Sequence, residues 1–392
     1  MPKRSIAQAD VRGTRALVRV DFNVPLRDGE VADDTRIRAA LPTIQNLLDR
    51  GAAVVLATHL GRPKGKADPA YSVAPVARRL GELLGLRVST VSAVAGPEAE
   101  RAASALDAGD VLMIENTRFE PGEEANDANL AAGLARLGDL FVNDAFGAAH
   151  RAHASTVGVA TLLPAYAGLL LQREETVLSR LLNDPERPFI AVLGGAKVSD
   201  KFAVLEHLLG RVDALLLGGG MANTVLLAQG HEIGSSLAEP DQVDDARRLI
   251  DNAEEQGVLM AVPTDVVTAR SLDSTQTNVA SVQTMPGDQA IFDIGPETVA
   301  RYCQQIARAR SVFWNGPMGV FEREPFASGT LGIARCVADA SAYTVVGGGD
   351  SLAALEAAGV GERIDHVSTG GGASLEYLEG RVLPGIAALP DA

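Results

Sequence analysis

Residues 189–209 read FIAVLGGAKVSDKFAVLEHLL, an apolar run followed by two glycines and then a stretch with helical spacing of its apolar residues. A short run rich in Val, Ile and Leu is typical of a parallel strand covered on both faces. The same order of strand, glycines and helix recurs at 217–221, 346–351 and 369–374. Alternation of strands with helices predicts an α/β fold built on parallel sheets.

The alternation extends over the whole chain and predicts two doubly wound domains. We expect strands at 16–24, 52–59, 87–91, 111–116 and 140–144 in the first half, and at 189–193, 214–217, 259–262, 290–293, 311–314, 343–346 and 366–368 in the second. A helix over 169–182 is expected to join the halves. The predicted domains are 1–168 and 186–374, with 169–185 between them. In open parallel sheets, ligands bind beyond the carboxyl ends of the strands, so functional residues should follow the strands.

Composition excludes several classes of protein. The chain has 392 residues and a formal net charge of −15, and no basic tract that would neutralise nucleic-acid phosphates. The first ten residues contain no apolar region typical of a secretory signal. The uncharged stretch 154–172 contains Pro and Gly and is interpreted as buried connecting structure, not a membrane span. Cys303 and Cys336 are interpreted as buried thiols in a reducing compartment. We therefore expect a cytoplasmic protein.

Lysine is scarce, and its placement favours a phosphate site. Only five lysines occur, and two of them, Lys197 and Lys201, lie in the glycine-rich segment after the strand at 189–193. A predicted helix over 198–209 would put both on one face. Glycines let phosphate approach the backbone, and helix N-termini attract anions, although tight turns alone also require glycine. Neither a Walker A sequence nor a GxGxxG fingerprint is present. Asp350 either caps the helix that follows it or binds Mg²⁺, or does both.

The first half places arginines after successive strands. Residues 1–170 contain 19 Lys and Arg against 20 Asp and Glu, whereas residues 171–392 contain 16 against 30. In the near-neutral half, Arg36, Arg62, Arg118 and Arg151 follow predicted strand ends. Guanidinium groups suit carboxylate and phosphate, so the pattern predicts a small anionic substrate, although each arginine alone is more typical of a surface ion pair. His150 and His153 have no evident third metal ligand, so we do not predict a metal there.

Taken together, these segments make the chain resemble the phosphoglycerate kinase family over essentially its full length. The matching segments are 20–25, 58–63, 115–119, 143–156, 194–201, 218–221, 314–322, 347–351 and 368–374. The resemblance implies two Rossmann-like domains facing a cleft, with residues 375–392 returning to the N-terminal one. It implies that the N-terminal domain binds 3-phosphoglycerate or 1,3-bisphosphoglycerate and that the C-terminal domain binds ATP or ADP with Mg²⁺. It also implies a monomer without membrane or nucleic-acid partners.

The resemblance further implies a set of site residues. For the phosphoglycerate they are Asp21, Phe22, Asn23, Arg36, His59, Leu60, Gly61, Arg62, Arg118 and Arg151. For the nucleotide they are Lys201, Gly219, Asn315, Glu322, Gly348, Gly349, Asp350 and Ser351, with Asp350 at the Mg²⁺. Arg36 and Lys197, with the helix start at Gly370, Gly371 and Gly372, would stabilise the transferring phosphoryl group. The chain departs from the family pattern at Ile291, where a glycine is common near the adenosine.

The reaction implied is reversible phosphoryl transfer between 1,3-bisphosphoglycerate and ADP. A substrate carboxylate is ionised at neutral pH, so catalysis needs no general base and rests on positioning and charge stabilisation. Substrates bound in separate domains must be brought together, so we expect a hinge closure. Two alternatives remain from the residues alone. A dehydrogenase lacks its dinucleotide fingerprint here, and a non-enzymatic anion-binding protein would leave Lys197, Lys201 and Asp350 without a role.

Overall fold

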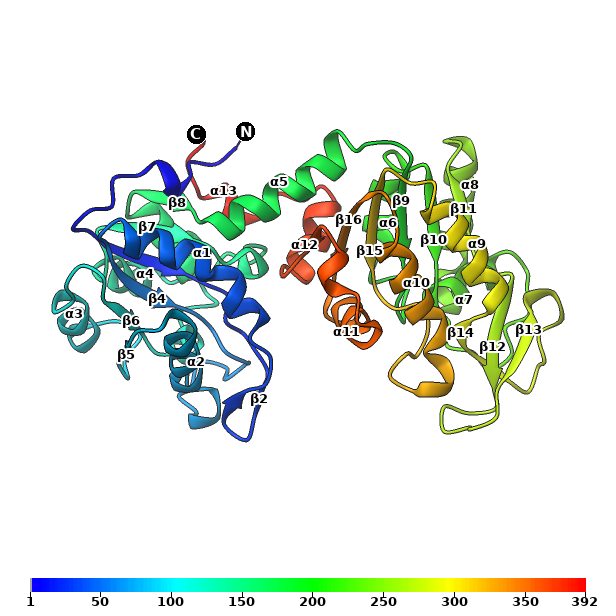
Figure 1. Ribbon diagram of the computed structural model, residues 1–392, viewed down its shortest axis with the longest axis horizontal. Helices are drawn as coiled ribbons and strands as arrows, with labels where there is room; N and C mark the ends of the chain where they lie inside the picture. The colour runs from blue at the N-terminus through cyan, green and yellow to red at the C-terminus, as the bar shows by residue number, and fades with distance from the viewer. Residues whose placement is uncertain (1) are drawn as a thin grey trace. The chain divides into compact units, whose positions relative to one another are not determined.

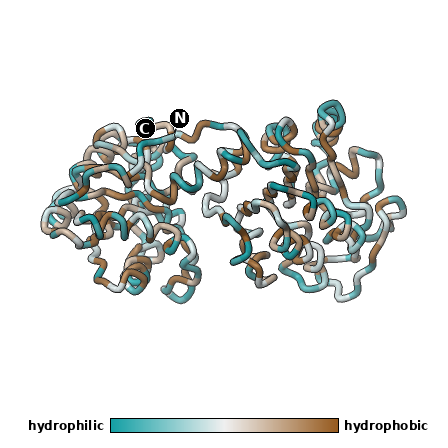
Figure 2. The backbone as a smooth tube through the Cα atoms, turned by 45° about the horizontal axis from the view of Figure 1, so that its top comes forward, coloured by the Kyte–Doolittle hydropathy of each residue, from teal (hydrophilic) through white to brown (hydrophobic). Residues whose placement is uncertain are grey.

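The computed structural model describes residues 2–392, which form two compact units (Figure 1). The first unit comprises Met1–Thr176 and Val382–Ala392, and the second comprises Val177–Arg381. Each unit has its own six-stranded parallel sheet, which confirms the predicted fold class. Apolar and polar stretches alternate along the backbone in both units, as expected where buried strands alternate with amphipathic helices (Figure 2). Within residues 2–392, no helix is both long enough and apolar enough to cross a membrane.

The sheet of the first unit has the strand order β5-β6-β4-β1-β7-β8. Its strands are β1 (Arg15–Arg19), β4 (Ala53–Ala57), β5 (Val88–Thr90), β6 (Val111–Met113), β7 (Leu140–Asn143) and β8 (Ala165–Ala167). A short hairpin comprises β2 (Leu26–Arg27) and β3 (Glu30–Val31). The helices are α1 (Thr35–Asp49), α2 (Ala74–Leu84), α3 (Pro97–Ser104) and α4 (Ala128–Ala135). From β1 the chain continues to β4 on one side and later returns to β7 on the other, so the order changes direction between β1 and β7.

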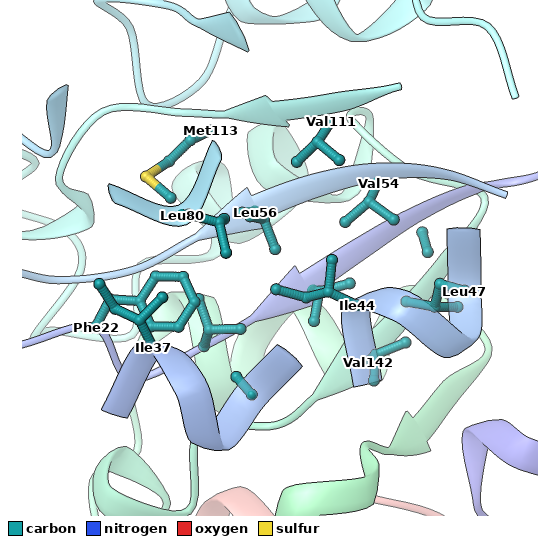
Figure 3. Close-up of a cluster of buried hydrophobic side chains, with 14 of the residues drawn as sticks. Phe22, Ile37, Ile44, Leu47, Val54, Leu56, Leu80, Val111, Met113 and Val142 are labelled. Atoms are coloured by element: carbon teal, nitrogen blue, oxygen red, sulfur yellow. The ribbon is translucent and has the colours of Figure 1, made fainter. Parts of the chain in front are cut away.

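One hydrophobic core of this unit fixes the segments that follow the strands. Phe22 and Ile37 are fully buried in it beside the sheet residues Val54 and Leu56 (Figure 3). Burying a large apolar side chain contributes about 1.5–3 kcal/mol. Since Phe22 lies next to Asp21, and Ile37 next to Arg36, the core holds the backbone on which these two charged residues stand.

The sheet of the second unit has the order β11-β10-β9-β15-β16-β17. Its strands are β9 (Phe189–Leu193), β10 (Ala214–Leu217), β11 (Leu259–Ala261), β15 (Ser311–Asn315), β16 (Tyr343–Gly347) and β17 (His366–Val367). The helices are α6 (Phe202–Leu209), α7 (Gly219–Ala228), α8 (Val243–Glu255), α9 (Pro296–Ile306), α10 (Ser328–Ala338), α11 (Gly349–Ala358) and α12 (Gly372–Leu378). Here the order changes direction between β9 and β15.

A small antiparallel sheet in the second unit was not expected. It comprises β12 (Asp265–Ala269), β13 (Asn278–Ser281) and β14 (Ala290–Ile294) in the order β13-β12-β14. The run at 290–293 is therefore a strand, but it does not belong to the parallel sheet as predicted. Apolar content identified the strand but not its partner. β14 pairs antiparallel with β12, which on its other side pairs with the exposed β13.

Helix α5 (Leu169–Asn183) connects the two units, close to the predicted 169–182. The chain later returns to the first unit at Val382, where α13 (Pro384–Ala387) packs against residues 154–158. Residues 375–381, which we expected to return as well, group with the second unit because α12 packs on α6.

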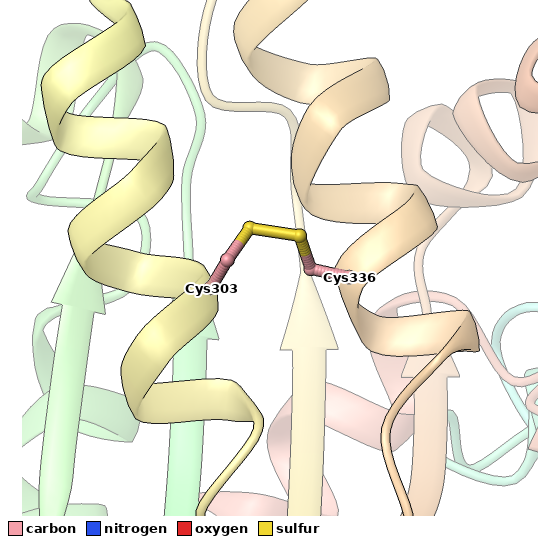
Figure 4. Close-up of a disulfide and its surroundings, with 2 residues drawn as sticks. All are labelled: Cys303 and Cys336. Atoms are coloured by element: carbon pink, nitrogen blue, oxygen red, sulfur yellow. A yellow bond between two sulfur atoms is a disulfide. The ribbon is translucent and has the colours of Figure 1, made fainter.

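The prediction of two free thiols is wrong. Cys303 in α9 and Cys336 in α10 form a disulfide with a Cα–Cα distance of 5.5 Å (Figure 4). The two helices pack side by side, which brings residues 33 positions apart into bonding distance. Sequence spacing does not reveal such a pair, since neither neighbouring residues nor a motif marks it. The cysteines consequently give no argument for a reducing compartment.

The first turn of α5 is capped by a buried carboxyl group. Asp144, directly after β7, accepts hydrogen bonds from the backbone N–H groups of Leu170 at 2.9 Å and Leu171 at 3.3 Å. A Cβ on Gly168 would lie 2.0 Å from the carboxyl oxygen, so this close approach requires glycine. Burial raises the pKa of Asp144 to about 7, although the two N–H groups favour its ionised form.

Removal of the disulfide should lower stability. In the chain-entropy model, a bond that closes a loop of 33 residues stabilises the fold by about 3–4 kcal/mol. We expect Cys303→Ser/Cys336→Ser to lower the free energy of unfolding in urea by an amount in this range. Dithiothreitol should destabilise the wild type to the same extent and leave the double variant unchanged. A wild type insensitive to reductant would contradict the disulfide.

Asp144 should make stability depend on pH. Its pKa in the folded state lies above the unfolded value of 3.8, so the folded state binds the extra proton. Its contribution to stability is therefore fully present below pH 3.8 and is lost as the pH rises towards 7. Relative to Asp144→Asn, which keeps the accepting oxygen, the wild type should lose on the order of 4 kcal/mol between pH 4 and 8. Urea titrations across this range measure the difference, and parallel curves would refute the raised pKa.

Candidate active site

In the first unit, three neighbouring strands end together. Arg19 at the end of β1 is paired with Ala57 of β4 on one side and with Asn143 of β7 on the other. The segments that follow these strands, together with the one after β6, carry the predicted substrate residues. We call this the first cluster: Asp21, Asn23, Arg36, His59, Gly61, Arg62, Arg118 and Arg151.

Direct contacts tie part of the first cluster together. The guanidinium of Arg36, in the first turn of α1, forms an ion pair of 2.8 Å with Asp21. The side-chain oxygen of Asn23 accepts the Gly61 N–H at 2.9 Å, and Arg118 donates to the Gly61 carbonyl at 2.8 Å. Three segments distant in sequence are thereby held around one loop.

Other residues predicted to bind the substrate are either exposed to solvent or buried in the hydrophobic core. Arg62 and Arg151 are exposed, and neither forms an ion pair within residues 2–392, so their charges remain open to a ligand. Phe22 and Leu60, which we expected to contact the substrate, have their side chains in the hydrophobic core. These two residues therefore position their neighbours and offer no side chain to a ligand.

The most deeply buried cation of this region, Arg19, was not among the predicted site residues. Arg19 is 1% exposed and lies beside His59, with 3.1 Å between its Nη2 and the Nδ1 of the ring. The available signal was an arginine within the otherwise apolar run 16–20. Burial, with Arg19, Arg118 and Arg36 nearby, lowers the pKa of His59 well below its usual value. Burial and the same Arg19 and Arg118 lower the pKa of His153 to about 4.

In the second unit, the ends of β9, β15 and β16 form the corresponding edge, with Leu193 paired to Asn315 and Asn315 to Gly347. The ammonium group of Lys201 lies here and donates to the Gly194 carbonyl, the Asn315 carbonyl and the Asn315 side-chain oxygen at 2.6, 3.0 and 2.6 Å. Burial lowers the pKa of Lys201 to about 8, while Asp350 and Asp200 counteract the shift. All three ammonium protons of Lys201 therefore form hydrogen bonds within the protein.

The predicted helix over 198–209 is wrong at its start. Helix α6 begins at Phe202, with Lys201 as its N-cap, and residues 198–201 form turns. Lys197 and Lys201 therefore do not share a helix face: Lys197 is exposed on the loop after β9, and Lys201 is largely buried. Residues 198–201 read VSDK, and Ser and Asp favour turns over the interior of a helix.

The loops around Lys201 are packed closely. The Asn315 amide donates to the Gly347 carbonyl at 2.9 Å, and the Gly316 N–H donates to the Ser351 hydroxyl at 2.6 Å. Gly219 has a φ of +67°, and a Cβ there would lie 2.5 Å from the Gly195 carbonyl oxygen. We call Lys201, Gly219, Asn315, Glu322 and Gly348–Ser351 the second cluster.

The remaining predicted residues lie at loop and helix starts. Asp350 is exposed in the first turn of α11, but Gly348 is the N-cap and no side chain caps the helix, so the capping hypothesis is wrong. Glu322 is exposed on the loop after β15, and among the interactions of residues 2–392 no hydrogen bond or ion pair joins it to Lys201. Gly371 is the N-cap of α12, and Gly372 begins it. Ile291 packs against a small cluster that includes Leu226 and Val266.

Comparisons with known proteins all point to one family. The family model for phosphoglycerate kinase matches residues 6–381. A curated phosphoglycerate kinase of Chloroflexus aurantiacus is 58% identical over the whole of both chains, and one of Moorella thermoacetica is 55% identical, again over both whole chains. The solved phosphoglycerate kinase of Coxiella burnetii is 43% identical, with a TM-score of 0.90 over 99% of this chain and 98% of that one. The corresponding structure from Pyrococcus horikoshii is 34% identical, with a TM-score of 0.88 over 98% of each chain.

Neither alternative function receives support from these comparisons. Full-length identity above 50% to curated enzymes, with two solved structures of the same fold, carries the assignment. The chain therefore belongs to the phosphoglycerate kinase family and is a phosphotransferase that acts on a carboxyl group.

Proposed function

We propose that the two clusters divide the family reaction between them. The first cluster binds 3-phosphoglycerate or 1,3-bisphosphoglycerate, and the second binds ATP or ADP. The observation that carries this division is the difference in their cations. The first cluster has four arginines in the segments that follow strands, which suit carboxylate and phosphate oxygens of a small acid. The second has one buried lysine among glycine-lined helix starts, which suit a chain of phosphates.

The chemistry requires positioning and charge, and it requires no proton transfer to start. A carboxylate oxygen of 3-phosphoglycerate attacks the γ-phosphorus of ATP, and the bond from that phosphorus to the oxygen bridging to the β-phosphorus breaks as ADP leaves with the electron pair. Arg36 and Lys197 stabilise the negative charge of the transferring phosphoryl group, with the backbone at Gly371 and Gly372. The ion pair with Asp21 orients Arg36 for this role. A nucleotide phosphate would compete with the three protein oxygens for the Lys201 ammonium.

The second cluster fits Mg²⁺ that arrives with the nucleotide. Within residues 2–392, no group of three or more His, Cys, Asp or Glu residues is placed to hold a metal ion. Mg²⁺ is typically bound by one or two carboxylates, several waters and substrate phosphates, and the single exposed carboxylate of Asp350 in the first turn of α11 matches this pattern. When bound, the ion neutralises phosphate charge.

We also propose that the enzyme acts as a monomer in the cytoplasm. One chain carries both clusters, so no second copy has to complete a site. The co-substrates ATP and ADP support the location.

Removal of either phosphoryl-stabilising cation should abolish most turnover. We expect Arg36→Ala and Lys197→Ala each to lower kcat by about 10³-fold or more in a coupled assay for ATP-dependent phosphorylation of 3-phosphoglycerate. Lys197→Ala should keep its denaturation midpoint because the side chain is exposed, and Arg36→Ala should remain folded although it leaves Asp21, 9% exposed, without its ion-pair partner.

Matched controls are Arg38→Ala, which removes an exposed arginine of the same helix, and Lys66→Ala, an exposed lysine outside both clusters. Both should retain normal turnover. Calorimetric titration should show that Arg36→Ala keeps its affinity for ADP. Near-normal kcat in both test variants would refute their roles, and a loss of ADP binding in Arg36→Ala would refute the division between clusters.

Loss of the proposed Mg²⁺ carboxylate should raise the metal requirement. We expect Asp350→Asn to need about tenfold more Mg²⁺ for half-maximal rate, since one charged ligand is replaced by a neutral one. Affinity for 3-phosphoglycerate should not change. Glu356→Gln, an exposed carboxylate of the same helix, is the control. An unaltered Mg²⁺ dependence in Asp350→Asn would assign the metal to other ligands.

A further inference from the structure

We infer that Arg19 is a positioning residue that fixes the ring proton of His59 on Nε2. The inference deepens the proposed role of His59 in binding phosphoglycerate and rests on that role only for its consequence. Its basis is a buried hydrogen-bond network behind the first cluster, formed by Arg19, His59, Ser155 and Glu123.

Arg19 is held from several sides. Its Nε donates to the Ser155 hydroxyl at 2.7 Å, one Nη donates to the Val20 carbonyl, and the other lies 3.1 Å from Nδ1 of His59. The side chain is 1% exposed. A guanidinium fixed at three points has one orientation, so the direction from which it approaches the ring is fixed as well.

The identity of the donor decides the tautomer. A guanidinium has five N–H donors and no acceptor, and it keeps its charge in proteins. In the contact with Arg19, Nδ1 of His59 must therefore be the acceptor. A neutral imidazole carries one proton, and with Nδ1 accepting, that proton is on Nε2.

Glu123 balances the buried charge. It is fully buried and accepts from both the backbone N–H and the hydroxyl of Ser155, the same hydroxyl that accepts from Arg19. Burial lowers the pKa of Arg19, and the charges of Glu123 and Asp21 counteract the shift. A buried cation without a counter-charge would lower the stability of the fold. Here the Glu123 carboxylate, joined to Arg19 through the Ser155 hydroxyl, compensates the charge.

The charges around His59 keep the ring neutral. Arg19 from β1, Arg36 from α1 and Arg118 from the segment after β6 face it, as does His153 from the segment after β7, and each lowers its pKa. The Asp21 carboxylate opposes them, with 3.9 Å between its Oδ1 and the ring Nδ1. Protonation would bring two cations to within 3.1 Å of each other. Nε2–H is consequently the one donor that the ring can offer a substrate oxygen.

Nitrogen-15 NMR of the imidazole rings tests the inference on the wild-type protein. The six histidines are resolved by ring correlation spectra, and His59 is identified by the signal that His59→Gln removes. From pH 6 to 8 we expect His59 to show an unprotonated Nδ1 and a protonated Nε2. A protonated Nδ1, or a ring that titrates in this range, would overturn the inference.

A double variant tests the action of Arg19 itself. Arg19→Met/Glu123→Gln removes the donor and its counter-charge together. We expect its His59 to lose the single Nε2–H form and the KM for 3-phosphoglycerate to rise about tenfold, with kcat changed less than threefold. Arg50→Met removes another partly buried arginine of the same unit, which donates to the carbonyls of Ile6 and Ala9, and should lower stability without moving the His59 signals or the KM.

The readouts separate this inference from the proposed function. If the double variant keeps the pure Nε2–H form, Arg19 does not set the tautomer and the inference is wrong. If it does not fold, the wild-type spectrum still decides. If the His59 ring signals of the wild type and the variant are as expected but 3-phosphoglycerate leaves the Nε2 signal unmoved and the KM of the variant is unchanged, the substrate-binding role of His59 fails and the positioning by Arg19 stands.

Discussion

Parallel pairing of strands far apart in sequence is the constraint on which both sites depend. β1 pairs with β7, and β9 pairs with β15, so segments more than a hundred residues apart begin from the same sheet edge. At each of these places the strand order changes direction, which leaves room for a ligand beyond the carboxyl ends. Arg19 and Lys201 occupy these two places. One is a fully buried arginine with a buried counter-charge, and the other a lysine whose protons are all bound to the protein.

Much of the fold follows from local apolar patterns. Strands such as β4 and β9, with all residues buried, give continuous apolar runs that stand out from the amphipathic helices. Local patterns do not show which strands pair with each other. The edge strand β8 and the polar β13 do not differ in apolar content from the segments around them. The pairing of β14 with β12 depends on tertiary contacts. The Cys303–Cys336 bond is also a property of helix packing, which no spacing in the sequence encodes.

The candidate site was predictable in its residue types and less so in its geometry. Arg36 and His59 follow strands, as the rule for parallel sheets predicts. The resemblance added residues such as Phe22 and Leu60, whose side chains proved to be core. Arg19 escaped because a charge inside a strand is not expected to be buried, and its partners Ser155 and Glu123 come from distant segments. Burial of charge is a three-dimensional fact that a single sequence does not display.

The return of the chain to its first unit has a consequence for the order of folding. Residues 382–392 complete that unit: Asn143 donates to Gly385, Arg4 to Pro390, and Lys3 contacts Asp391. The second unit, Val177–Arg381, is continuous in sequence. During synthesis, the first unit therefore cannot be completed until residues 382–392 have been made, after the whole of the second unit. The second unit is therefore synthesised completely before the first unit has all its residues.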